Sequence, residues 1–263
     1  MGKRVLTILF LVFLSLNLEA KKINEKECVS LGEKFIFAGD ECIEFVSFEG
    51  DTNEHIIVIV HGTWDEGTNT LGRYAPFAET MNMNTDLTTI AVALPGYSGS
   101  STNNLPSLAD KKVHTNQAGR KVYVEFLGKI ISSLKEKYEA SEVTLIGHSA
   151  GARMAATLTG LEANLVQNVA LAGGGYTTKP ENKGEGFLSF SDVIDNASKD
   201  TNYLFIYGTE DKISKPEVTT EFFKIALEKG LNAKLVKVEG AAHIDLDMTD
   251  TSIEAITNML EEE

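Results

Sequence analysis

Short apolar runs recur from His55 to the C-terminus, separated by longer amphipathic stretches. The runs are rich in Val and Ile and are not interrupted by alternating polar residues, which is typical of strands buried on both faces of a parallel sheet. They are Ile56–Val60, Thr89–Leu94, Val143–Ile146, Val166–Leu171, Tyr203–Tyr207 and Leu235–Val238. Apolar residues at helical spacing predict helices over Val122–Tyr138 and Glu221–Leu231. We therefore predict an α/β fold, with a mostly parallel central sheet and helices on both faces.

The segments flanking this pattern predict further elements. Cys42–Phe48 alternates apolar with polar residues, which predicts an antiparallel edge strand before His55. The apolar run that leads into Ala38-Gly39-Asp40 predicts a hairpin with a glycine-containing turn. At the other end of the chain, Thr251-Ser252-Ile253-Glu254 has capping-box spacing and predicts the start of the last helix.

A long stretch without a clear strand or helix pattern covers residues 173–200. It contains several Gly, Lys and Asn residues, followed by Phe187, Leu188 and Phe190. Loops of this length in a compact domain are usually functional or mobile. We interpret it as a short, lid-like insertion before the acid-bearing strand, within a single domain that spans 21–263.

Residues 1–20 have the pattern of a secretory signal peptide. Lys3 and Arg4 precede the apolar run Val5–Leu16, and the segment ends at the small residue Ala20. The apolar run is shorter than the about 20 residues that a transmembrane helix needs. We therefore predict a secreted or periplasmic protein, with an uncleaved membrane anchor as the alternative.

The chain has two cysteines, Cys28 and Cys42, shortly after this segment. Thiols in an exported protein meet an oxidising compartment, so we expect these two to form a disulfide. Two free thiols are the alternative. Neither cysteine has a sequence setting that indicates catalysis.

Composition and charge narrow the range of partners. The 263 residues are 43% hydrophobic and 24% charged, which excludes a disordered or collagen-like chain. The 38 acidic residues exceed the 24 basic ones, and the net charge is −14. Such a surface repels phosphate backbones and anionic lipids, so we expect no nucleic-acid partner and no membrane association of the mature chain. The oligomeric state cannot be predicted from these features.

The most informative motif is Gly147-His148-Ser149-Ala150-Gly151, a G-x-S-x-G sequence. It follows a predicted strand and precedes Ala152–Ala156, a run with high helix propensity. A serine on such a sharp strand-to-helix turn needs small neighbours, because side chains two residues away on either side would collide. The helix N-terminus that follows favours developing negative charge. The motif therefore makes Ser149 a candidate nucleophile.

A serine hydroxyl needs a base to remove its proton, and the base needs an orienting acid. His243 follows the last predicted strand after a loop of small residues, which makes it the candidate base. Asp211 follows the preceding strand and is the candidate acid, with the adjacent Glu210 as the alternative. In this arrangement His243 would take the proton of Ser149, and Asp211 would fix the imidazole tautomer.

Together these motifs resemble the α/β-hydrolase superfamily, roughly from His55 to the C-terminus. Two further segments contribute, Val58-Ile59-Val60-His61-Gly62 and Leu94-Pro95-Gly96-Tyr97-Ser98-Gly99-Ser100. The first resembles the family's strand ending in His-Gly, and the second its Gly-aromatic turn after the next strand. The resemblance implies an oxyanion hole formed by the backbone amides of Thr63 and Ala150.

The sequence indicates the substrate-binding residues less clearly than the catalytic ones. Trp64 follows the expected oxyanion residue, and we include it with Phe187 and Phe190 as candidate substrate-binding residues. The two phenylalanines either line an acyl pocket or pack the insertion against the domain. We expect no metal and no cofactor, because the sequence contains neither an H-E-x-x-H motif nor a Cys/His cluster.

These features predict an exported serine hydrolase that works through an acyl-enzyme intermediate. A carboxylic-ester hydrolase acting on a small-molecule ester is the preferred reading. The alternatives are an amidase or serine peptidase resembling the prolyl oligopeptidase group, or a non-catalytic binding protein on the same fold.

Overall fold

A computed structural model describes residues 22–109, 116–178 and 186–261. It contains one eight-stranded sheet, whose strands are β1 (Phe35–Ala38), β2 (Glu41–Phe48), β3 (Thr52–Val60), β4 (Leu87–Val92), β5 (Glu142–His148), β6 (Asn168–Ala172), β7 (Asn202–Gly208) and β8 (Asn232–Val238). Their order across the sheet is β1-β2-β4-β3-β5-β6-β7-β8. β2 pairs antiparallel with β1 and β4, and the pairings from β4 to β8 are parallel. The predicted fold class is confirmed.

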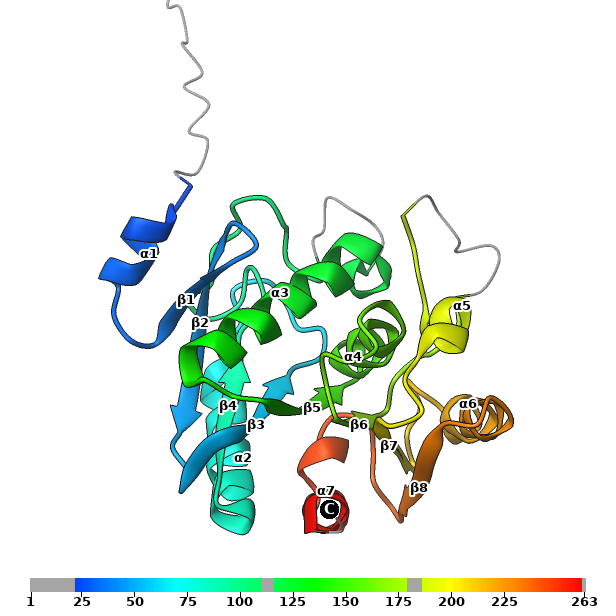
Figure 1. The fold of residues 1–263 in the computed structure, drawn as a ribbon. Helices are drawn as coiled ribbons and strands as arrows, with labels where there is room; N and C mark the ends of the chain where they lie inside the picture. Colours follow the sequence, from blue (N-terminus) through cyan, green and yellow to red (C-terminus); the bar gives the residue numbers. More distant parts are fainter. Residues whose placement is uncertain (1–21, 110–115, 179–185, 262–263) are drawn as a thin grey trace, which may run out of the picture.

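Helices cover both faces of the sheet (Figure 1). Within the described residues the α-helices are α1 (Glu25–Ser30), α2 (Thr70–Thr85), α3 (Lys121–Tyr138), α4 (Ala150–Leu161), α5 (Phe190–Val193), α6 (Pro216–Glu228) and α7 (Asp250–Glu261), and the short 3₁₀ helices are η1 (Gln117–Gly119), η3 (Ile194–Asn196) and η4 (Leu246–Met248). In Figure 1, α3 and α4 lie on one side of the sheet, and α2 and α7 lie on the other.

The central strands are buried on both faces, as the continuous apolar runs predict. Each residue from Ile56 to Val60 in β3 is at most 1% exposed. Side chains of a strand point alternately to the two faces, so this continuous burial requires helices on both sides. The predicted strand positions are confirmed within a few residues. The helix predicted over Val122–Tyr138 begins one residue earlier, and the helix predicted at Glu221 begins at Pro216.

The predicted hairpin is formed by β1 and β2. Ala38 pairs with Glu41, which leaves Gly39 and Asp40 as a two-residue turn. Both turn residues have positive φ angles, 54° and 67°, as the tightest type of hairpin turn requires. The predicted cysteine pair forms a disulfide, with Cys28 in α1 bonded to Cys42 in β2. This bond links the first described helix to β2, the second strand of the sheet.

The last helix begins earlier than the sequence predicts. Thr251 lies within the first turn of α7, and Thr249 caps the helix instead by accepting a hydrogen bond from the amide of Ser252 at 3.2 Å. The capping box predicted at Thr251 is therefore wrong. Thr249, Thr251 and Ser252 all have side chains that can cap a helix, and the sequence pattern does not show which of them leaves the helical conformation.

The described part of 173–200 is less irregular than predicted. Its second half forms α5 and η3, and α5 begins with a capping box between Ser189 and Asp192. α5 packs closely on α4, because a Cβ atom on Gly160 would lie 2.5 Å from Val193 Cγ2. A helix of four residues is too short to show a hydrophobic period, which explains why the sequence did not predict it. The lid-like character of the segment stays a prediction.

The predicted signal peptide, 1–20, lies outside the described residues. Among the residues that the structure describes, no helix is long and apolar enough to cross a bilayer.

We predict that the disulfide stabilises the fold. Cys28 and Cys42 are 14 positions apart, and closing a loop of that size is expected to contribute about 3 kcal/mol, mainly by restricting the unfolded chain. Urea unfolding of the wild type should shift to lower denaturant when a reductant is added. The double variant Cys28→Ser/Cys42→Ser should unfold like the reduced wild type and be insensitive to reductant. A wild-type transition that reductant leaves unchanged would contradict this prediction.

Candidate active site

Ser149 occupies a strained turn between β5 and α4. Its φ and ψ angles are 55° and −112°, a conformation that non-glycine residues rarely adopt. The flanking glycines leave room for this turn. A Cβ atom on Gly151 would lie 2.3 Å from the carbonyl oxygen of Val60, and one on Gly147 would lie 2.6 Å from the amide nitrogen of Ala152. The steric argument for the two glycines of the motif therefore holds in the structure.

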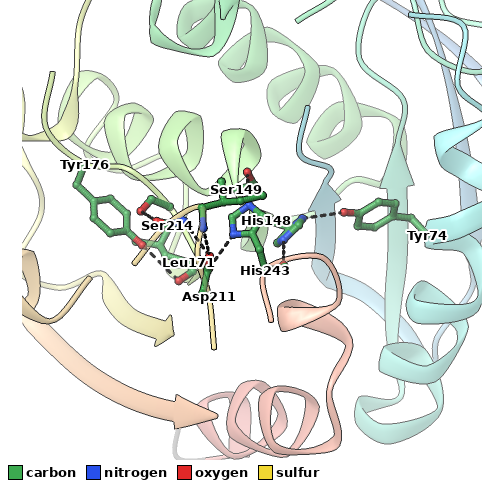
Figure 2. Close-up of polar contacts among 10 residues, drawn as sticks. Tyr74, His148, Ser149, Leu171, Tyr176, Asp211, Ser214 and His243 are labelled. Carbon is green, nitrogen blue, oxygen red and sulfur yellow. Dashed lines mark hydrogen bonds and ion pairs between the residues drawn. The ribbon is translucent and has the colours of Figure 1, made fainter. Parts of the chain in front are cut away.

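The three predicted catalytic side chains lie together beyond the carboxyl ends of their strands. His243 Nε2 is 2.8 Å from Ser149 Oγ, and His243 Nδ1 is 2.7 Å from Asp211 Oδ2. Figure 2 shows the three groups as a continuous chain of hydrogen bonds. Since a carboxylate accepts but does not donate, Nδ1 carries the proton and Nε2 is free to accept one from the serine. Ser149 is partly exposed, so a substrate can approach its hydroxyl.

The geometry shows which of the two candidate acids, Asp211 or Glu210, contacts the His243 imidazole. Asp211 is 3% exposed, and its Oδ1 accepts hydrogen bonds from the amides of Ile213 and Ser214, both at 2.8 Å. Its other oxygen faces His243. Glu210 is exposed, and its backbone amide donates to the carbonyl of Ala241. Asp211 is therefore the carboxylate that orients the imidazole, and the two amides hold it in place.

The residues expected to form the oxyanion hole flank Ser149. Ala150 is the first residue of α4, where a backbone amide has no acceptor within the helix. Thr63 follows Gly62, whose Cβ position would lie only 3.0 Å from Ser149 Cβ, so the backbone there passes close to the serine. The hydroxyl of Thr63 accepts a hydrogen bond from Asn116 Nδ2 at 2.7 Å. These positions are compatible with both amides facing the carbonyl oxygen of a substrate. The oxyanion hole itself stays a prediction.

His61 supports the loop that carries Thr63. Its Nδ1 donates to the carbonyl of Gly62 at 2.7 Å, and its Nε2 accepts from the amide of Leu94 at 3.0 Å. Desolvation by burial lowers the pKa of His61 to about 4. The imidazole is therefore neutral at physiological pH, and its two hydrogen bonds join the loop after β3 to the loop after β4.

A second buried polar group lies on the other side of His243. His148 is 3% exposed, and its ring nitrogens contact the carbonyl of His243 at 2.7 Å and the hydroxyl of Tyr74 at 3.2 Å. Burial raises the pKa of Tyr74, which keeps the phenol protonated. Asp247 is fully buried nearby, and within the described part of the chain its carboxylate has no hydrogen-bond partner. Burial raises the pKa of that carboxyl group.

The candidate substrate-binding residues have different positions. Phe190 is 0% exposed, stacks on Tyr203 and makes a tilted ring contact with Phe222, so it packs the insertion against the domain and does not reach a substrate. The sequence could not separate these two roles, because an apolar residue suits both. Phe187 is partly exposed and lies 5.9 Å from the guanidinium of Arg120. Trp64 is also partly exposed, and the guanidinium of Arg73 lies 4.9 Å from its ring.

Sequence reasoning missed several polar residues of the site. The amide of Ser214 donates a hydrogen bond to Asp211, and its hydroxyl donates one to the carbonyl of Gly174 at 2.7 Å. Its only sequence signal is a position three residues after an acid, a common spacing for such turns. Arg73 and Tyr74 lie in the first part of α2, a helix that the sequence analysis did not predict. Nothing in the sequence pattern indicates that Tyr74 contacts His148 or that Arg73 contacts the loop after β8. In the described parts of the chain, no three His, Cys, Asp or Glu side chains are grouped closely enough to hold a metal ion.

We predict a pH-dependent contribution of His61 to stability. Its pKa is about 4 in the folded chain against 6.5 for the unperturbed group. The unfolded chain therefore binds the proton first, and the stability that neutral His61 provides is present above pH 6.5 and is lost as the pH falls toward 4. Over this range the unfolding free energy of the wild type should fall by up to about 3 kcal/mol more than that of a His61→Gln variant.

The amide of glutamine keeps one donor and one acceptor but does not titrate, which makes His61→Gln the matched control. Urea unfolding at a series of pH values compares the two proteins. Parallel pH profiles would show that His61 does not change its protonation on unfolding, contrary to this account.

The comparisons with known proteins agree with this architecture. The model of the Alpha/beta hydrolase family matches residues 57–195, more than half of the chain. No curated relative matches the chain in sequence.

Solved structures with the same fold include several esterases and a lipase. An esterase of Pyrococcus furiosus has a TM-score of 0.65 at 16% identity, covering 87% of this chain and 90% of its own. A carboxylesterase of Bacillus cereus has a TM-score of 0.57 at 17% identity, covering 84% and 94%. A monoacylglycerol lipase of Paleococcus ferrophilus has the same TM-score at 18% identity, covering 84% and 98%. At these identities the likeness concerns the fold. The family match shows that the chain belongs to the alpha/beta hydrolase family.

Proposed function

We propose that this chain is an exported serine hydrolase that cleaves carboxylic esters through an acyl-enzyme intermediate. The observation that carries the proposal is the hydrogen-bonded chain from Ser149 Oγ through the His243 imidazole to Asp211. A partly exposed serine on a strained turn, with an imidazole lone pair directed at its hydroxyl, has the geometry of an activated nucleophile.

In the first half of the reaction, Ser149 Oγ attacks the acyl carbon while His243 Nε2 takes the hydroxyl proton. The carboxylate of Asp211 keeps the proton on Nδ1 and stabilises the imidazolium that forms. The negative charge develops on the carbonyl oxygen, where the amides of Thr63 and Ala150 donate hydrogen bonds. His243 then gives its new proton to the leaving alcohol, the ester C–O bond breaks, and the acyl group stays on Ser149.

The second half repeats these steps with water as the nucleophile. His243 removes a proton from water, the hydroxide attacks the acyl-enzyme, and the same two amides stabilise the second tetrahedral intermediate. When this intermediate collapses, His243 returns the proton to Ser149 Oγ and the carboxylic acid leaves. No net electron transfer occurs, so the proposed reaction needs no redox cofactor.

We prefer an ester over an amide as the substrate because several solved structures with a similar fold are esterases or lipases. The structures similar to it include an esterase, a carboxylesterase and a monoacylglycerol lipase. The triad itself does not discriminate, since esters and amides are cleaved by the same groups. An alcohol is also a better leaving group than an amine, so less assistance is required from the protein.

Export is part of the proposal. Residues 1–20 have the three regions of a secretory signal peptide. The disulfide between Cys28 and Cys42 agrees with an oxidising compartment, such as the periplasm or the outside of the cell. On this proposal the working enzyme starts near residue 21 and acts on small soluble esters.

Three single substitutions test the triad. Ser149→Ala should abolish ester hydrolysis and covalent labelling by a fluorophosphonate, because the attacking oxygen is missing. His243→Ala and Asp211→Asn should each lower kcat by about a thousandfold or more, with the fold intact. Ser132→Ala, on the exposed face of α3, is the matched control and should keep wild-type activity. Full activity of the His243→Ala variant would contradict the assignment of His243 as the general base.

A substrate panel tests the ester assignment. Nitrophenyl esters of graded acyl length and aminoacyl nitroanilides release related chromophores, so their kcat/KM values can be compared directly. We expect turnover of the esters to exceed that of the anilides by at least about a hundredfold, a difference of about 3 kcal/mol in the barrier. The reverse order would favour an amidase or peptidase. Absence of both turnover and fluorophosphonate labelling would favour a binding protein.

A further inference from the structure

The histidine inside the G-x-S-x-G motif contacts the main chain of the proposed base. His148 is the last residue of β5, and Ser149 follows it directly. Figure 2 shows the His148 ring between His243 and Tyr74, away from the Ser149 hydroxyl. The rings of His148 and His243 lie 5.0 Å apart between their centres. The side chain of His148 does not reach the reacting atoms, and it has no role in the mechanism described above.

The contacts of His148 determine its tautomer. A carbonyl oxygen only accepts hydrogen bonds, so Nε2 of His148 must carry the proton that it donates to the carbonyl of His243, at 2.7 Å. Nδ1 is then an acceptor, and the hydroxyl of Tyr74 donates to it at 3.2 Å. Tyr74 therefore holds His148 in the form that can bind the His243 carbonyl, and both groups are buried from water.

Close to His243, the loop after β8 makes few other hydrogen bonds with the rest of the protein. It contains a glycine with positive φ at Gly240, and Ala242 and Ile244 on either side of His243 are exposed. The carbonyl of His243 also accepts from the amide of Leu246, at a longer distance of 3.4 Å. The next carbonyl, that of Ile244, accepts from Arg73 Nη2 at 2.9 Å, and the same guanidinium pairs with Asp245. Side chains from β5 and α2 therefore hold two consecutive carbonyls of this loop.

We propose that His148 is a positioning residue for the ester-hydrolysing triad, a role that rests on the function proposed above. Its hydrogen bond fixes the backbone of His243 relative to β5, the same strand that delivers Ser149. This hydrogen bond is therefore one of the contacts that set the distance between the serine oxygen and the imidazole, and it is the shorter of the two that the His243 carbonyl accepts. Displacements of about 1 Å in such a pair can lower the rate about a hundredfold.

Two polar substitutions separate this role from a general contribution to packing. In His148→Gln, the terminal amide nitrogen can take the place of Nε2 and donate to the His243 carbonyl. In His148→Asn, the shorter side chain places its amide near the position of Nδ1, where it meets Tyr74 but does not reach that carbonyl. We expect kcat of His148→Asn to fall about a hundredfold with KM within about twofold, and kcat of His148→Gln to stay within about threefold of the wild type.

Two further variants provide a control and an independent test. His55→Asn makes the same substitution at the opposite end of the sheet, in β3, and should keep wild-type kcat. Tyr74→Phe deletes only the hydroxyl that fixes the His148 tautomer and should lower kcat several-fold. Thermal unfolding of all variants verifies that they are folded. If the His148 variants do not fold, Tyr74→Phe carries the test, and an unchanged kcat in that variant would contradict the proposal.

The outcomes distinguish this inference from the proposed function. Wild-type kcat in His148→Asn would overturn the positioning role, and so would equal losses in the Asn and Gln variants, because only one of them lacks the donor. If the wild type hydrolyses no ester, the proposed function fails, and proton NMR still tests the positioning role. The low-field signal of the proton between His243 and Asp211 should persist in His148→Gln and weaken or shift in His148→Asn. The same signal in both variants would overturn the inference.

Discussion

The hydrogen bond between Ser149 Oγ and His243 Nε2 joins two residues that are 94 positions apart in the chain. It exists because β5, β6, β7 and β8 are parallel neighbours in one sheet, so their carboxyl ends meet at the same edge. Three of the loops at that edge contribute one group each: the serine after β5, the carboxylate after β7 and the imidazole after β8. The buried Val- and Ile-rich strands thus determine where the chemistry is located, and the loops determine how accurately it is aligned.

Alignment is provided by hydrogen bonds to main-chain atoms. Asp211 is held by the amides of Ile213 and Ser214, and the His243 carbonyl by His148. Neutral His61 joins the carbonyl of Gly62 to the amide of Leu94. Such bonds are strong where the groups are buried, because water does not compete for them. A site built on loops can in this way hold the geometry that the proposed reaction needs.

Much of this arrangement could be predicted from the sequence because it depends on local chemistry. The strand positions follow from continuous apolar runs, and the turn at Ser149 follows from two glycines at fixed spacing. Long-range packing could not be predicted in the same way. An apolar Phe190 suits a pocket or a core, and only the neighbouring Tyr203 and Phe222 show that it belongs to the core. The contact of Tyr74 with His148 and that of Arg73 with the loop after β8 depend on how α2 packs in the fold, which no local sequence pattern predicts.

The central claim is that Ser149 becomes covalently acylated during turnover. Mixing the enzyme with a nitrophenyl ester, quenching with acid within a few milliseconds to seconds, and measuring the intact protein mass tests this directly. The account predicts a transient mass increase equal to the acyl group, which peptide mapping assigns to Ser149 and which disappears as the ester is exhausted. Steady hydrolysis without any acylated protein, or an acyl group on another residue, would contradict it.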